Sequence, residues 1–266
     1  IYYIKLSFSY RDFTDLIPAK SLGLGSSGSI ELGSERYGGT LSFGAHVTTN
    51  YEFEVGISRF EDTLFLDLIS PIPTRYSALP IYASFQSDSL DNINFPNLGL
   101  KSDIIWTKEM NTWGSDYDFE QIYISIEKPL SIYANNITIF TKYGSTYHIK
   151  SDTALAGNFS LGGLFNLSGY EPYSINDTNM LLGIVKYRYQ IKDGGFFGAI
   201  NTPLYAGFSF EAGDAWGVEH DFGYNNIKKS ATIYLAADTF LGPFYLAFAQ
   251  TDTGESSGYL YLGEKF

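Results

Sequence analysis

Two neighbouring segments, TLSFGAHVT at residues 40–48 and YEFEVGIS at residues 51–58, decide the fold because their side chains alternate between apolar and polar. In the second segment, Phe53, Val55 and Ile57 alternate with charged, small or hydroxyl-bearing side chains. Successive side chains of a β-strand point to opposite faces. Each segment is therefore predicted to be a strand with one apolar and one polar face.

The same alternation recurs along the chain, for example at residues 122–127 and 231–238. Turn signals such as Gly242-Pro243 separate the alternating segments. Helical i, i+3, i+4 spacing of apolar residues is absent over any useful length. We predict an all-β chain with about fourteen strands of roughly ten residues each. No shift in composition marks a boundary, so residues 1–266 are expected to form a single domain.

Composition excludes several classes of function. The chain has 266 residues, 17% of them aromatic and 17% charged, with a net charge of -12 and no cysteine. The lack of cysteine excludes disulfide scaffolds, cysteine zinc sites and thiol catalysis. The negative charge excludes a phosphate-neutralising surface, so no nucleic-acid partner is expected. The sequence has no run of about 18 apolar residues, so no transmembrane helix is predicted.

A soluble β-sandwich and a membrane β-barrel both show alternating strands. The polar faces here are built mainly from Gly, Ser, Thr and Tyr, with few lysines, whereas a water-facing sandwich surface usually carries Lys and Glu freely. The strands are also long enough to cross a bilayer at a tilt. These features favour a transmembrane antiparallel β-barrel, with outer-membrane lipids against its apolar face.

The last nine residues, GYLYLGEKF, end an alternating segment on an aromatic residue. Leu260, Leu262 and Phe266 share one face, and Tyr259 and Tyr261 share the other. This pattern resembles the C-terminal insertion signal of bacterial outer-membrane barrels. It implies recognition by the barrel assembly machinery and a location in the outer membrane of a diderm bacterium.

Three segments resemble the BamA/TamA-type surface-antigen barrels. They are DTFLGPFYLAFAQ at residues 238–250, FSFEAGDAW at residues 208–216, and FSLGGLFNLSGYEPY at residues 159–173. The resemblance implies a barrel of about sixteen strands. It also implies that a long loop, about residues 151–178 and called the lumen loop below, folds back into the barrel.

The sequence pattern LGG…NLSGY is most similar to that of one subgroup, the C-terminal barrels of patatin-like phospholipases that are type V autotransporters. The lumen-loop motif of this chain is Leu167, Ser168, Gly169 and Tyr170. Assembly-machine members carry an Arg where this chain has Ser168. The substitution argues against an insertase mechanism that depends on that Arg.

Two cations and one carboxylate are predicted to face the lumen. Lys186 and Arg188 share one face of the segment at residues 181–191, and a cation facing lipid at mid-bilayer costs about 2–4 kcal/mol. Glu211 lies on the polar face of the next strand. Because a buried charge needs a partner, Lys186 or Arg188 is predicted to pair with Glu211. The alternative is that Glu211 meets water or a loop amide.

The sequence contains no catalytic motif. A patatin-type nucleophile needs a G-x-S-x-G turn, which is absent. His46, His148 and His220 are scattered without the spacing of a metal site. The chain itself is therefore expected to be no enzyme and to bind no metal or cofactor.

The resemblance implies that this chain is the anchor and translocator domain of a patatin-like phospholipase autotransporter, with an N-terminal passenger domain as its partner. The alternatives are the barrel of a BamA/TamA-like insertase or translocation protein, and a diffusion porin. The lumen loop argues against the porin because it would plug an open channel.

The topology of the loops follows from parity. If the C-terminus is periplasmic, as in this class of barrel, the loop at residues 251–258 is extracellular and the turn at residues 239–243 is periplasmic. Counting back places residues 217–229 and the lumen loop outside as well. Long loops are thus expected on the extracellular side and short turns on the periplasmic side.

The terminal pattern predicts that Phe266→Lys lowers outer-membrane assembly far more than Glu255→Lys, because only the first change places a charge at the end of the lipid-facing row. Heat-modifiable migration of outer-membrane fractions on gels measures assembly. Equal assembly of the two variants would contradict the terminal signal.

Overall fold

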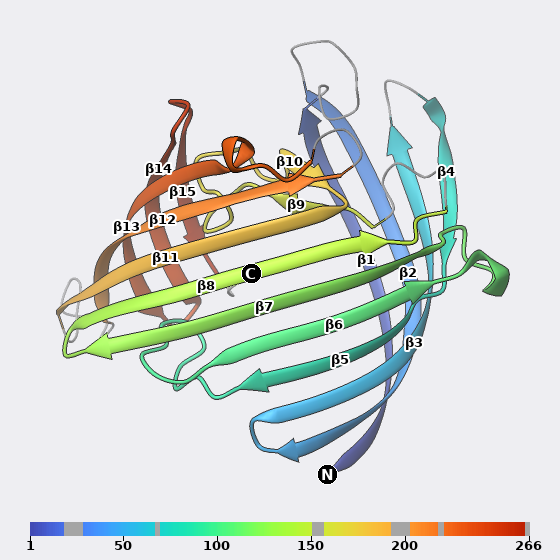
Figure 1. The fold of residues 1–266 in the computed structure, drawn as a ribbon, viewed down its shortest axis with the longest axis horizontal. Helices are drawn as coiled ribbons and strands as arrows, with labels where there is room; N and C mark the ends of the chain where they lie inside the picture. Colours follow the sequence, from blue (N-terminus) through green and yellow to red (C-terminus); the bar gives the residue numbers. More distant parts are fainter. Residues whose placement is uncertain (19–28, 67–69, 151–156, 193–202, 218–220, 264–266) are drawn as a thin grey trace. The chain divides into compact units, whose positions relative to one another are not determined.

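The computed structural model describes six stretches of the chain, which are residues 1–18, 29–66, 70–150, 157–192, 203–217 and 221–263 (Figure 1). Its strands are β1 (Tyr2–Pro18), β2 (Ser29–Thr48), β3 (Tyr51–Leu66), β4 (Ser70–Ala78), β5 (Ile81–Asp88), β6 (Lys101–Glu109), β7 (Phe119–Ile132), β8 (Asn135–Tyr147), β9 (Phe159–Leu161), β10 (Ile175–Asp177), β11 (Asn179–Lys192), β12 (Leu204–Trp216), β13 (Lys228–Thr239), β14 (Gly242–Thr251) and β15 (Ser256–Leu262). Two short 3-10 helices, Asn111–Trp113 and Tyr224–Asn226, complete the described elements.

The all-β prediction is confirmed. Thirteen strands form one sheet in the order β1-β2-β3-β5-β6-β7-β8-β11-β12-β13-β14-β15, with β4 paired to β3, and β9 and β10 form a separate pair. The sheet is antiparallel, as a barrel of this type requires. The described residues do not reach the sixteen strands that the resemblance implies. No helix among them is long and apolar enough to span a membrane.

The chain groups into two compact units. Unit 1 comprises residues 1–86, 103–123 and 144–158, and unit 2 comprises residues 87–102, 124–143 and 159–266. Strands β5 to β8 contribute residues to both units.

In unit 1, strands β1, β2 and β3 are longer than the ten residues expected, with 17, 20 and 16 residues. The predicted alternation holds on β3, where Phe53, Val55 and Ile57 are exposed on one face. On the opposite face Glu54 accepts a hydrogen bond from the Tyr3 hydroxyl at 2.8 Å. The polar side chains therefore find partners on the inner face, and the apolar ones do not cover a core.

The proline-rich segment that follows β3, residues 70–100, contains two strands as well as a loop. It forms β4 and β5, which two residues separate, and its remaining residues 89–100, called the β5–β6 loop below, lie outside strands. Pro71 and Pro73 lie within β4, which pairs with β3 in the described sheet and has no second described partner. A proline cannot donate to a ladder, so strands of this composition are tolerated at sheet edges.

In unit 2, strands β11 to β14 run side by side (Figure 1). On β13, Ile233 and Leu235 are 64% and 45% exposed, whereas Thr232, Tyr234 and Ala236 are at most 5% exposed. The apolar row is thus outside and the more polar row is buried. This is the reverse of a soluble sandwich and is typical of a barrel that presents its apolar band to lipid.

A charge on the outer row of β13 is expected to impair assembly. Ile233→Lys places an ammonium where lipid should lie, at a cost of about 2–4 kcal/mol near the bilayer midplane. Phe240→Lys is the matched control, because Phe240 is an apolar residue of the β13–β14 turn that is even more exposed, at 84%. Heat-modifiable migration should fall for Ile233→Lys and stay near the unmodified level for Phe240→Lys. Similar assembly of both variants would contradict a lipid-facing outer row.

Candidate functional site

The lumen loop is described from residue 157 onward and has its own backbone structure. Strands β9 and β10 pair antiparallel, with Leu161 opposite Ile175, and lie beside β12 (Figure 1). Gly162 has a φ of +113°, and a Cβ there would lie 2.0 Å from the Glu171 carbonyl oxygen. Only glycine tolerates such a position, so this residue permits the tight return of the loop.

The centre of the site is a hydrogen-bonded pair, Ser168 and Glu211, from the lumen loop and strand β12. The Ser168 amide donates to Oε2 of Glu211 and its hydroxyl donates to Oε1, both at 2.7 Å. The hydroxyls of Ser209 and Thr232 also donate to Oε1, at 2.8 and 3.2 Å. Glu211 is only 2% exposed, and these donors compensate its loss of water.

The neighbouring residues of the motif bind two further strands. The Gly169 amide donates to the Ser230 hydroxyl of β13 at 2.8 Å. From β15, the Ser257 hydroxyl donates to the Gly169 carbonyl at 3.3 Å, and the Tyr259 hydroxyl donates to the Ser168 carbonyl at 2.6 Å. The lumen-loop motif therefore lies against strand β12, which bears Glu211, and also contacts β13 and β15.

The two outer residues of the motif have different roles. Leu167 is fully buried with a φ of +72°, a strained conformation that the surrounding contacts must impose. The Tyr170 hydroxyl donates to Asp252 at 3.4 Å. Burial, together with the negative charges of Asp252 and Glu255, raises the pKa of Tyr170, so the phenol stays a neutral donor.

The expected ion pair of Glu211 with Lys186 or Arg188 does not occur among the described contacts. Glu211 instead meets a loop amide, which was the alternative. The Lys186 ammonium lies 4.3 Å from the centre of the Phe165 ring of the lumen loop. Arg188 donates to the β5–β6 loop, including the carbonyl of Pro96 at 3.1 Å.

The register of the β11–β12 pair explains why Arg188 does not reach Glu211. Ile184 lies opposite Glu211, whereas Arg188 lies opposite Gly207, four residues further along. At about 3.3 Å per residue this offset is roughly 13 Å, too far for an ion pair. Alternation predicted the correct face for the cations but could not predict the register.

The C-terminal residues have the predicted facing where they are described. Leu260 and Leu262 are 77% and 51% exposed. Tyr259 binds the lumen loop, and Tyr261 packs against the buried aromatic cluster of unit 2. Phe266 lies outside the described residues.

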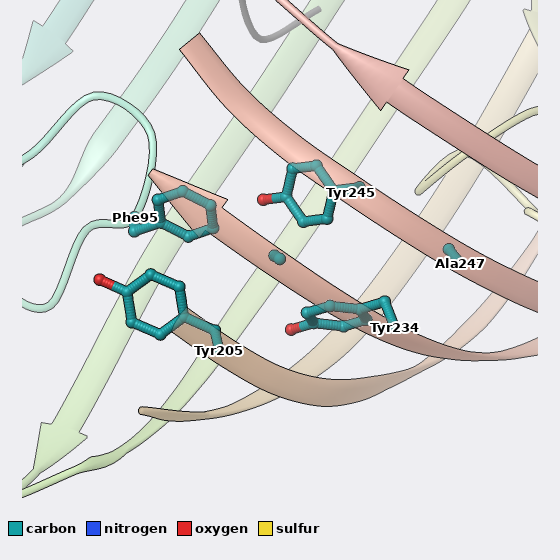
Figure 2. Packing of buried hydrophobic residues seen from close by; sticks show 6 residues of the cluster. Phe95, Tyr205, Tyr234, Tyr245 and Ala247 are labelled. Carbon is teal, nitrogen blue, oxygen red and sulfur yellow. The ribbon is translucent and has the colours of Figure 1, made fainter. Parts of the chain in front are cut away.

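Sequence reasoning missed this buried cluster, which is shown in Figure 2 and consists of Phe95, Tyr205, Tyr234, Ala236, Tyr245 and Ala247. Phe95 comes from the β5–β6 loop, and the other members come from β12, β13 and β14. A usable signal was present, because Phe95-Pro96 lies in a loop far longer than a hairpin turn.

Metal ligands do not gather in the parts of the chain that the structure describes, where no group of three or more His, Asp or Glu side chains could hold an ion. The recognisable site is therefore the set of hydrogen bonds that holds Ser168 and Gly169 of the lumen loop against strands β12, β13 and β15, called the seat below.

An outward apolar row, a polar inner face and a loop seated on that face together define an outer-membrane β-barrel. The chain belongs to the Omp85 superfamily, whose domain it matches over residues 3–266. Barrels of this superfamily lie in the outer membrane of Gram-negative bacteria.

Two solved structures share the fold. BamA from Haemophilus ducreyi lacking POTRA domains 1-3 matches with a TM-score of 0.77 at 14% identity, over 97% of this chain and 58% of that one. CdiB from Acinetobacter baumannii matches with a TM-score of 0.60 at 12% identity, over 96% of this chain and 46% of that one. This chain thus spans about half the length of these proteins. No curated protein sequence matches it.

Gly169 offers a test of the seat. A Cβ at this position would lie 2.5 Å from Cγ2 and 2.7 Å from the amide nitrogen of Thr251, so the backbone must shift. Gly169→Ala should destabilise the seated loop by about 1–3 kcal/mol, the usual cost of overpacking.

The measurements are the heating temperature at which gel migration changes and the rate of proteolysis within the lumen loop. Gly258→Ala is the matched control, because nothing lies within 4 Å of a Cβ there. If Gly169→Ala behaves like Gly258→Ala, the close approach of the loop to β14 is wrong.

Proposed function

We propose that this chain is the barrel of an Omp85-type protein that translocates or assembles other proteins at the outer membrane. The observation that carries the proposal is the superfamily match over residues 3–266, combined with a lumen loop seated on Glu211. The fold likeness to BamA and CdiB supports this function more than a lipase anchor.

The seat holds one part of the wall and the loop as a unit. The Ser168-Gly169 pair contacts β12 through Glu211, β13 through Ser230, and β15 through Tyr259. Strands β12 to β15 and the lumen loop are therefore expected to move together. A loop held this way occupies the inner face, which disfavours an open diffusion porin.

Ser168 sets this chain apart from the assembly-machine members, which carry an Arg at this position. Glu211 is satisfied here by neutral donors instead of a guanidinium. A mechanism that needs the Arg charge is therefore unavailable, whereas one that needs only a seated loop is supported. For this reason we favour translocation of particular partners over a general insertase.

A second candidate function is the membrane anchor of a patatin-like phospholipase. It rests only on the sequence pattern LGG…NLSGY of the lumen loop. In that case an N-terminal passenger domain is the partner of this barrel. Any catalysis would belong to that passenger, since the chain itself has no catalytic motif.

The test is deletion of the gene in its host, followed by quantification of outer-membrane and secreted proteins. Under the proposed function, one or more other proteins are lost from the surface, and the intact gene restores them. Glu211→Ala should restore them poorly, because it leaves Ser168 without its acceptor. Glu255→Ala is the control, since Glu255 is an exposed loop carboxylate.

The two functions predict different outcomes. A barrel that only anchors a lipase would leave all other surface proteins unchanged. The sequence of the full-length protein before residue 1 would then encode a G-x-S-x-G lipase domain. Both findings together would overturn the translocation proposal.

A further inference from the structure

The β5–β6 loop, residues 89–100, is an ordered structure of its own. The Ser89 amide donates to the Leu100 carbonyl at 3.0 Å and closes the base of the loop. Oδ1 of Asp91 accepts the amides of Asn97 and Leu98 at 2.7 and 3.0 Å. Slight burial raises the pKa of Asp91, but the backbone hydrogen bonds lower it by more. The pKa therefore lies below its ordinary value and the carboxylate stays charged.

The tip of this loop is buried against the inner face of unit 2. Phe95 is 2% exposed, and its ring centre lies 4.6 Å from that of Tyr205 and 5.7 Å from that of Tyr245 (Figure 2). Aromatic pairs at these distances contribute beyond their buried area. The loop therefore packs into the wall and does not simply join two strands.

Arg188 of β11 fixes the loop tip. Its guanidinium donates to the carbonyls of Phe95 and Pro96 at 3.2 and 3.1 Å, and to Oδ1 of Asn97 at 2.8 Å. The same group lies 4.8 Å from the centre of the Tyr205 ring. A buried guanidinium is costly without such partners, so the loop and Arg188 stabilise each other.

Further hydrogen bonds tie the loop to two more strands. The side-chain amide of Asn136 in β8 donates to the Pro96 carbonyl at 3.2 Å. The Asn94 side chain donates to Asp238 of β13 at 3.0 Å. The loop is thus bound to β8, β11 and β13 as well as to the aromatic cluster.

Contacts with strand β13 show that the β5–β6 loop and the lumen loop reach the inner face from opposite ends of the strand. Ser230, near the start of β13, binds the lumen loop, whereas Asp238, near its end, binds the β5–β6 loop. Eight residues of strand separate these positions, which is about 27 Å. The two loops therefore reach the inner face from the two ends of the same strand.

The tips of the two loops meet at one side chain. The ring centre of Tyr245 lies 5.2 Å from that of Phe165 in the lumen loop and 5.7 Å from that of Phe95 in the β5–β6 loop. Phe165 also packs edge-on against Tyr234 at 5.4 Å.

We propose that the β5–β6 loop is a second plug, locked by Arg188, which closes the lumen from the end opposite to the lumen loop. The lumen then has two barriers in series that share Tyr245. This inference goes beyond the proposed function and does not rest on it, because it concerns the permeability of the barrel and not its clients.

A plain connection between β5 and β6 needs no such structure. The β7–β8 and β13–β14 turns at the same end are two residues each, residues 133–134 and 240–241. Hairpins need no more than this. A twelve-residue loop that buries a phenylalanine and engages a buried arginine has a role besides closing the hairpin.

The first experiment measures planar-bilayer conductance. The variants are a lumen-loop variant, with residues 160–176 replaced by a short Gly-Ser linker, and the same protein with Phe95→Ser and Arg188→Gln added. The linker variant alone should conduct about as little as the unmodified protein, and the combined variant roughly tenfold more, because both barriers are then removed. Full conductance from the linker variant alone would overturn the second plug.

The second experiment needs no large deletion and uses the absence of cysteine from the chain. Ala236 is fully buried in the cluster with Phe95, so Ala236→Cys should react slowly with a charged maleimide. Adding Arg188→Gln should speed the reaction by roughly tenfold, because the loop then leaves the wall more often. Ile93→Cys, at an 82% exposed position of the same loop, should react quickly in both backgrounds.

Lys229→Gln is the matched control for the charge change, since Lys229 is an exposed cation of unit 2. It should leave the reaction of Ala236→Cys unchanged. Heat-modifiable migration confirms that each variant is folded. If Arg188→Gln also leaves that reaction unchanged in folded protein, Arg188 does not lock the loop and the proposal is wrong.

Discussion

The buried carboxylate of Glu211 is the constraint on which the site depends. A carboxylate withdrawn from water must find donors, and the described donors come from both the wall and the lumen loop. Ser168 supplies two of the four hydrogen bonds. Removing the loop would leave the carboxylate under-satisfied, and removing the carboxylate would leave the Ser168 amide unpaired. Each therefore holds the other in place.

Alternation along single strands was enough to predict the class of fold and the facing of most side chains. The period of two is a local property, so it can be read from segments such as residues 51–58 without knowledge of their partners. The outward facing of Ile233 and the inward facing of Tyr234 follow directly from it. The inward fold of the lumen loop was expected from a family resemblance that is also carried by a contiguous segment, residues 159–173.

The partners of the cations could not be predicted in the same way. Arg188 faces inward as alternation requires, but its partner is the loop that contains Phe95, 93 residues away in sequence. Nothing local to β11 encodes that contact. The register of the β11–β12 pair was also needed to see that Arg188 and Glu211 lie too far apart. Contacts between segments distant in sequence depend on tertiary packing, which periodicity does not report.

Tyrosine is well suited to an inner face that must hold two loops. Its ring provides apolar area for packing, and its hydroxyl still finds a polar partner, as Tyr234 does at the Tyr187 carbonyl at 2.9 Å. Tyr245 contacts the phenylalanine of each loop, so displacing either loop removes packing from the ring that the other loop uses. Contacts that share a residue are generally not additive in free energy. The two loops are therefore energetically coupled through this ring, although no described hydrogen bond joins them directly.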